Sequence, residues 1–194
     1  MRSKSKWVLL LGIMLILSGL GLMLVTQNAA RNAQKEIAEM MVQLEEMLPP
    51  RSAGAKEQYA SMQMPVLELD GREIVGIIEM PEWNVSLPIG GTWNTKNLHS
   101  FPQRFSGTVY DDSLIVGGMD LEGQFECLKK MDIGNTVIVT DMTGAQFSYS
   151  VTYIERKKTA EAEVLEGAKD GLTLFIRDVN SMDYIIVRCI ADGL

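Results

Sequence analysis

The residues able to act as nucleophile, acid or base in this chain are few and widely spaced. There is one histidine, His99, and there are two cysteines, Cys127 and Cys189. A cysteine nucleophile needs a base or a cation close to its sulfur, and neither cysteine has His99 near it in sequence. Their number and spacing match no disulfide framework and no metal-ligand motif. Both are expected to be small packed hydrophobes and His99 a surface loop residue. Whether the two cysteines pair stays open.

Arg177 is the most unusual charged residue. It follows the apolar run "LTLFI" (residues 172–176), where a strand should leave a buried sheet. A guanidinium is always protonated, so it is neither nucleophile nor base, but its fork of donors suits a carboxylate or a phosphate. Asp120, Asp178 or Asp183 would neutralise it if paired with it. The sequence therefore predicts either an anion-binding arginine or a salt-bridged one.

Two further groups of side chains are candidates for ligand binding. The acidic residues around the run "SLIVGG" offer oxygen atoms to Ca²⁺, but they lack the spacing of a dedicated site, so no metal and no cofactor are predicted: Asp111, Asp112, Asp120 and Glu122. The aromatic residues of the early part of the domain either anchor a bound peptide or fill the core: Trp83, Trp93 and Phe101.

Composition excludes one class of partner. The 194 residues are 46% hydrophobic, which is ample for a core, and they carry 18 basic and 25 acidic side chains for a net charge of −7. Nucleic-acid binding depends on phosphate neutralisation by Lys and Arg. No nucleic-acid partner is predicted.

The N-terminus has the pattern of a membrane anchor. The basic tip "MRSKSK" precedes residues 7–26, "WVLLLGIMLILSGLGLMLVT", which contain no charge. About 20 apolar residues cover the roughly 30 Å hydrocarbon core of a bilayer, and the basic flank stays in the cytoplasm. We expect residues 1–28 to form a single-pass anchor with the rest of the chain extracellular. A cleaved signal peptide is the alternative.

Residues 29–63 are expected to form a helical stalk and a linker. Apolar residues recur every three or four positions on one face of the predicted helix: Ile37, Met40, Met41, Leu44 and Leu48. The helix either serves as a partner-binding or coiled-coil stalk, or it lies on the domain or extends the anchor. "LPPRSAGAKEQYASMQ" then has the composition of a linker, so the domain should span residues 64–194.

The pattern from residue 64 onward is that of a mainly β domain. Short apolar runs alternate with turn residues, and Asp70-Gly71 inside "VLELDGREIVGIIEM" is a strong hairpin signal. "GQFECLKKM" (residues 123–131) reads as the one convincing short helix, with Phe125, Leu128 and Met131 on one face. Short strands with brief helices between them favour a closed or nearly closed β-barrel.

Several of these segments, in their order, resemble the sortases, membrane-anchored cysteine transpeptidases of Gram-positive bacteria. The similarity is carried by "GIIEMPEWNVSLPI", "DDSLIVGGM", "GQFECLKKMDIGNTVIVTDMTGAQFSYSV", "LTLFIRD" and "YIIVRC". The resemblance implies a closed eight-stranded sortase-type β-barrel with short helices. It also implies a site in which a cysteine thiolate attacks a sorting signal, commonly of LPXTG type, assisted by a histidine and an arginine.

This chain departs from the family at all three catalytic positions. The family's histidine is matched by Gly118, its cysteine by Arg177 and its arginine by Tyr184. No catalytic residue is therefore assigned, and the ligand-binding candidates are Arg177, Tyr184, Gly118, Asp120 and Trp93.

These replacements favour a non-catalytic, sortase-like protein at the cell surface. Its expected partners are a sorting-signal peptide, a surface protein or pilin of the cell wall, or an active sortase. Two alternatives remain: an active cysteine transpeptidase with a rearranged site, and a structural surface component.

Overall fold

The computed structural model describes residues 12, 14, 16–18, 34–54, 63–159 and 171–192. The chain divides into two compact units, Met1–Ala38 and Glu39–Leu194. The predicted membrane anchor lies largely outside the described residues, although the few described positions within it are helical. No helix in the described ranges combines the length and apolar character needed to cross a membrane.

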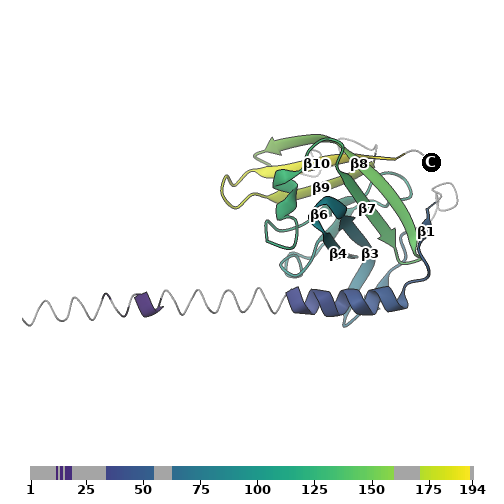
Figure 1. Cartoon of the computed structure of the whole chain (residues 1–194), viewed down its shortest axis with the longest axis horizontal. Helices are drawn as coiled ribbons and strands as arrows, with labels where there is room; N and C mark the ends of the chain where they lie inside the picture. The colour runs from purple at the N-terminus through teal and green to yellow at the C-terminus, as the bar shows by residue number, and fades with distance from the viewer. Residues whose placement is uncertain are drawn as a thin grey trace, which may run out of the picture. The chain divides into compact units, whose positions relative to one another are not determined.

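The second unit is built on a closed β-barrel (Figure 1). Neighbouring strands follow the order β3, β4, β5, β6, β9, β10, β8 and β7, and β7 pairs again with β3 to close the ring. The strands are β3 (Arg72–Met80), β4 (Val85–Gly90), β5 (Gln103–Ser106), β6 (Ile115–Gly117), β7 (Thr136–Asp141), β8 (Ala145–Lys157), β9 (Gly171–Arg177) and β10 (Tyr184–Ala191). The prediction of a mainly β, eight-stranded barrel is confirmed.

The predicted hairpin at Asp70-Gly71 is also present. It joins β2 (Leu67–Leu69) to β3, with Leu69 opposite Arg72. Asp70 and Gly71 both have positive φ, 51° and 72°. Two such residues give the turn whose twist matches that of the flanking strands, which explains why this dipeptide connects them.

The helix over residues 34–47 contributes to the barrel's core from residue 39 onward. Met40 and Leu44 are buried in one cluster with Ile74, Ile77 and Phe101. Their four-residue spacing places both side chains on the same helix face. The compact unit therefore begins at Glu39, upstream of the domain start expected at residue 64.

The segment expected to be a linker is partly structured. It contains β1 (Ser52–Ala53), which pairs in parallel with β8. Arg51 forms ion pairs with Glu45 of the helix and Glu79 of β3. The chain between helix and barrel is thus held against the sheet at residues 51–53.

The predicted helix at residues 123–131 is shorter than expected and of a different type. It is the 3-10 helix η2 (Glu126–Lys130), following a turn over residues 122–125. Phe125, Leu128 and Met131 are all buried, as their spacing predicts. A second 3-10 helix, η1 (Pro81–Trp83), joins β3 to β4.

Strand β9 lies inside the sheet and leads to the site. It pairs with β6 in parallel and with β10 antiparallel. Residues 171–176 are all buried, whereas Arg177, the last residue of the strand, is exposed. A strand covered on both faces is apolar at consecutive positions, which accounts for the unbroken run before the arginine.

Candidate functional site

The structure brings four of the five ligand-binding candidates to one pocket. It lies where β6 and β9 end and β10 begins, and its volume is about 490 Å³. The lining is mainly apolar and contains one cation: Trp93, Leu98, Phe105, Gly118, Met119, Phe175, Arg177, Val179, Met182 and Tyr184. Asp120 is absent from this lining. We call this cavity the Arg177 pocket.

Strand pairing explains why these residues meet. Tyr184 is directly opposite Arg177 in the β9–β10 ladder, and Gly117 is opposite Phe175 in the β6–β9 ladder. The backbone N–H of Gly118 donates to the carbonyl oxygen of Phe175 at 3.0 Å. Residues distant in sequence are thus fixed at one end of three adjacent strands.

In the described part of the chain, Arg177 has no carboxylate partner. Among the described residues it forms no ion pair, because Asp178 pairs with Arg156 at 3.0 Å and Asp120 with Lys129 at 2.6 Å. The Arg177 Nε donates a long hydrogen bond, 3.4 Å, to the carbonyl of Met182, and its Cζ lies 5.9 Å from the centre of the Tyr184 ring. Within the described ranges the structure therefore does not contain the salt-bridged alternative, and Arg177 is exposed.

Asp120 supports the pocket from outside. Its Oδ2 accepts a hydrogen bond from the backbone N–H of Val179 at 3.0 Å, and its carboxylate raises the pKa of Lys129 through their hydrogen bond. Val179 and Met182 belong to the β9–β10 loop and form one wall of the pocket. The role of Asp120 in the structure is thus to position that wall.

Asp178 organises the same loop. Its carboxylate accepts hydrogen bonds from the Asn180 N–H at 2.9 Å, the Ser181 hydroxyl at 3.1 Å and Arg156 at 3.0 Å. These bonds, foremost that from Asn180, lower the pKa of Asp178 to about 2. Because the ionised form accepts all these bonds, the loop geometry depends on it.

Acid should weaken the loop through Asp178. A carboxyl whose folded pKa lies below the unfolded value of about 3.9 stabilises the fold above that pH. Its contribution is lost as the pH falls from about 4 to about 2. The unfolding free energy of the wild type should exceed that of Asp178→Asn at pH 6, and the difference should shrink over this window. A constant difference across it would contradict this role for ionisation.

A matched control for that titration lies in the same loop. The Asp183 side chain forms no ion pair in the described part of the chain. At pH 6, Asp183→Asn should therefore lower the unfolding free energy less than Asp178→Asn does.

Position 118 has no room for a side chain. A Cβ at Gly118 would lie 2.5 Å from Cδ2 and 2.7 Å from Cγ of Phe125, a fully buried ring. The neighbouring Gly117 is covered by Phe175 and Trp93 in the same manner. Three aromatic rings therefore fill the space beside β6: Phe125 from the turn before η2, Phe175 from β9 and Trp93 from the loop after β4.

Three aromatic side chains form a wall at the pocket. Ring centroids of Trp93 and Phe105 are 5.2 Å apart, those of Trp93 and Phe175 5.7 Å, and those of Phe105 and Phe175 5.8 Å. We call this cluster the aromatic wall. Phe101, in contrast, is buried under the helix, and Trp83 does not line the pocket.

The thiols lie away from the pocket and are poorly ionised. Both cysteines are free and buried, and the Cys127 Sγ is 3.4 Å from the Sδ of Met80 in the core. Burial raises the pKa of Cys127 to about 11 and that of Cys189 to about 12. His99 is exposed in a turn. This placement agrees with two packed cysteines and a surface histidine.

The acidic residues around β6 do not gather into a site. Within the described ranges, no group of three or more His, Cys, Asp or Glu side chains is arranged to hold a metal ion.

The apolar residues that line the Arg177 pocket were not predicted from the sequence: Leu98, Phe105, Met119, Phe175, Val179 and Met182. Part of this lining could have been predicted. Arg177 ends a strand at the site, so the loop that follows it, which contains Val179 and Met182, must lie beside the site.

Comparisons with known proteins identify the fold. No protein-family model and no curated protein sequence matches the chain. Solved sortase structures do match. Sortase A from Corynebacterium diphtheriae (a lid mutant) is 17% identical, with a TM-score of 0.58 over 84% of this chain and 96% of its own. A sortase D5 transpeptidase from Clostridium perfringens is 16% identical, with a TM-score of 0.58 over 82% and 98%.

A third match was solved with a peptide. Sortase C from Clostridium perfringens, in a structure with the C-terminal cell wall sorting motif, is 15% identical, with a TM-score of 0.55 over 82% of this chain and 91% of its own. Together these similarities show that the chain has the sortase fold.

Proposed function

We propose that this sortase-fold chain is a non-catalytic binding protein, held at the outer face of the cell membrane, that recognises a sorting-signal peptide in the Arg177 pocket. The observation that carries the proposal is the pocket itself. It is an apolar cavity at the strand ends where the resemblance puts the reaction centre. Its described lining presents no thiol, and its guanidinium has no ion-pair partner among the described residues.

The lining suits an extended peptide. Leu98, Phe105 and Phe175 offer apolar contact area, and aromatic anchors commonly carry peptide affinity. The terminal nitrogens of Arg177 can donate to peptide carbonyls or to a carboxylate, and the Tyr184 ring beside it holds the guanidinium in place. Binding of a sorting motif by the Clostridium perfringens sortase C supports a peptide as the ligand here.

The extracellular location rests on the N-terminal sequence. A basic tip followed by about 20 uncharged residues is typical of a single-pass anchor with its N-terminus in the cytoplasm. Placed outside, the domain would meet sorting signals of surface proteins or pilins, and it could also contact an active sortase. A structural role at the surface would need no ligand in the pocket.

A fluorescent LPXTG-type peptide added to intact cells that express the full chain tests binding and location together, because the peptide does not cross the membrane. We expect saturable labelling of the cells and recovery of the peptide uncleaved. Arg177→Gln should weaken binding about tenfold or more, the size of a lost charge-assisted hydrogen bond.

The matched control is Lys158→Gln, which removes one positive charge from an exposed site at the end of β8. It should bind as the wild type does. Equal binding by Arg177→Gln and wild type would reject the pocket as the site. Peptide cleavage that disappears in Cys127→Ala or Cys189→Ala would show an active transpeptidase instead.

A further inference from the structure

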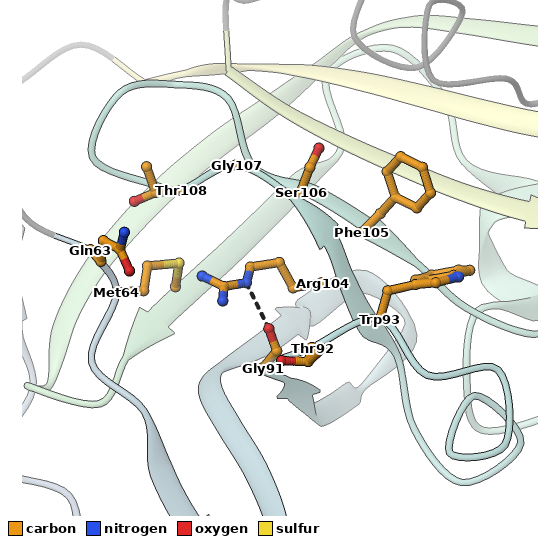
Figure 2. Close-up of a pocket in the computed structure, with 10 residues that line it drawn as sticks. All are labelled: Gln63, Met64, Gly91, Thr92, Trp93, Arg104, Phe105, Ser106, Gly107 and Thr108. Carbon is orange, nitrogen blue, oxygen red and sulfur yellow. Dashed lines mark hydrogen bonds between the residues drawn. The ribbon is translucent and has the colours of Figure 1, made fainter.

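A second cavity lies on the other side of the aromatic wall. Its volume is also about 490 Å³, and it shares Trp93 and Phe105 with the Arg177 pocket. Its remaining lining combines polar side chains with Met64 and two glycines: Gln63, Met64, Gly91, Thr92, Arg104, Ser106, Gly107 and Thr108. Figure 2 shows the Arg104 side chain extending through the middle of this cavity toward Met64.

Within the described part of the chain, Arg104 is anchored at one edge of its guanidinium. Its Nε donates to the carbonyl oxygen of Gly91 at 2.8 Å. Over the described ranges, neither Nη1 nor Nη2 has a hydrogen-bond or ion-pair partner. Arg177 has the same arrangement on the opposite side of the wall, with its Nε on the Met182 carbonyl. The backbone thus fixes the direction of the Arg104 fork and leaves its outer edge open.

The surroundings of Arg104 favour an anionic partner. The side chain is half-buried, and burial lowers the pKa of its guanidinium, an effect that Glu73 partly offsets. A cation removed from water gains more from a partner than an exposed one does. Glu73 forms no ion pair with Arg104; instead its Oε2 accepts a hydrogen bond from the Thr92 hydroxyl at 2.7 Å.

The opposite wall of the cavity is a rigid turn. Gly107 has a φ of 76°, and a Cβ there would collide with the carbonyl oxygen of Ser113. The Thr108 N–H donates to the Ser113 hydroxyl at 3.1 Å, and the Ser113 N–H donates back to the Thr108 carbonyl at 3.2 Å. These two bonds and the conformation of Gly107 shape the turn that brings Ser106 and Thr108 into the lining of the cavity.

We infer that this cavity, the Arg104 pocket, is a binding site for a peptide carboxylate, the side chain of a glutamate or an aspartate. The open edge of the guanidinium receives the two carboxylate oxygens side by side, a pairing that is both strong and directional. A single negative charge fits better than a doubly charged phosphate, because Glu73 already lies close to the arginine. This site does not depend on the proposed function of the Arg177 pocket.

NMR titration of the full chain in detergent micelles tests the inference. The probes are N-acetyl-glutamate N-methylamide and its glutamine counterpart, which differ only in the carboxylate. We expect the glutamate probe to shift the Arg104 Nε–H and the Gly107 and Thr108 amide signals saturably. The glutamine probe should bind at least about tenfold more weakly, the worth of one charge-assisted pair.

Variants then assign the site. Arg104→Gln should abolish the shifts, Arg104→Lys should weaken them because an ammonium lacks the fork, and Arg177→Gln should leave them unchanged. Equal binding of the two probes by the native chain, a comparison that needs no variant, would overturn the inference. So would shifts that persist in Arg104→Gln, or shifts confined to Val179 and Met182 of the other pocket.

Discussion

Iodoacetamide should modify the native chain at pH 8 at less than about one hundredth of the rate of a free cysteine. With pKa values of about 11 and 12, Cys127 and Cys189 are about 0.1% and 0.01% thiolate at that pH, against about a quarter for a free thiol of pKa about 8.5. A more basic thiolate is also a better nucleophile, and this raises the reaction rate again by about tenfold. Burial lowers the rate further and by more, because the reagent reaches a buried thiol only when the core opens locally.

The measurement is the rate of mass gain on the intact chain, repeated from pH 7 to 10. The rate should rise with pH throughout, because neither thiol is half-ionised below pH 10. Chain unfolded in guanidinium chloride should react as free cysteine does, and Cys127→Ser and Cys189→Ser assign each signal. A native thiol that reacts faster than free cysteine would restore the hypothesis of an active transpeptidase with a rearranged site.

Gly118→His should destabilise the protein by at least about 3 kcal/mol, the upper part of the range for overpacked cores. Its φ lies outside the left-handed region, so the backbone itself would accept a side chain. The obstacle is Phe125, whose Cδ2, Cγ and Cβ would lie 2.5 to 3.0 Å from the new Cβ. Urea unfolding of the full chain in detergent, followed by fluorescence, measures the loss.

A double-mutant cycle identifies the cause of that loss. Gly118→Ala alone should cost about 1–3 kcal/mol, and Phe125→Ala alone about 3–5 kcal/mol through the cavity it leaves. In the Phe125→Ala background, Gly118→Ala should cost much less than in the wild type, because the ring is gone and only the Cβ of residue 125, 3.0 Å away, remains. The same cost for Gly118→Ala in both backgrounds would show that Phe125 is not the obstacle.

Local pattern was enough to predict much of the fold. The β-rich domain, the Asp70-Gly71 hairpin and the apolar helix stripe follow from side-chain period and turn chemistry, which act over a few residues. The position within the helix at which the domain begins could not be predicted in this way. Whether Met40 and Leu44 pack on a partner or on β3 depends on tertiary contacts that no local pattern encodes. The same limit applies to β1, a two-residue strand inside a linker-like segment.

The candidate site was predictable in part. Gly118, Arg177 and Tyr184 could be placed together because strand order and register follow once the sortase resemblance is stated. The partners of Asp120 and Asp178 were not predictable, since Lys129 and Arg156 reach them from other parts of the chain. The close contact of Phe125 with Gly118 was not predictable either, because it depends on how the turn before η2 packs on β6 to within tenths of an ångström.

The contact between Gly118 and Phe125 limits which substitutions position 118 can accept. A side chain at position 118 requires a smaller residue at position 125, and a smaller residue at 125 leaves a hole in the core. Each change alone lowers stability by an amount that matters to a protein with about 5–15 kcal/mol in total. A histidine at position 118 therefore requires a second change at position 125, and either order of the two changes passes through a less stable protein. Packing against Phe125 thus constrains the residue at position 118 independently of any ligand.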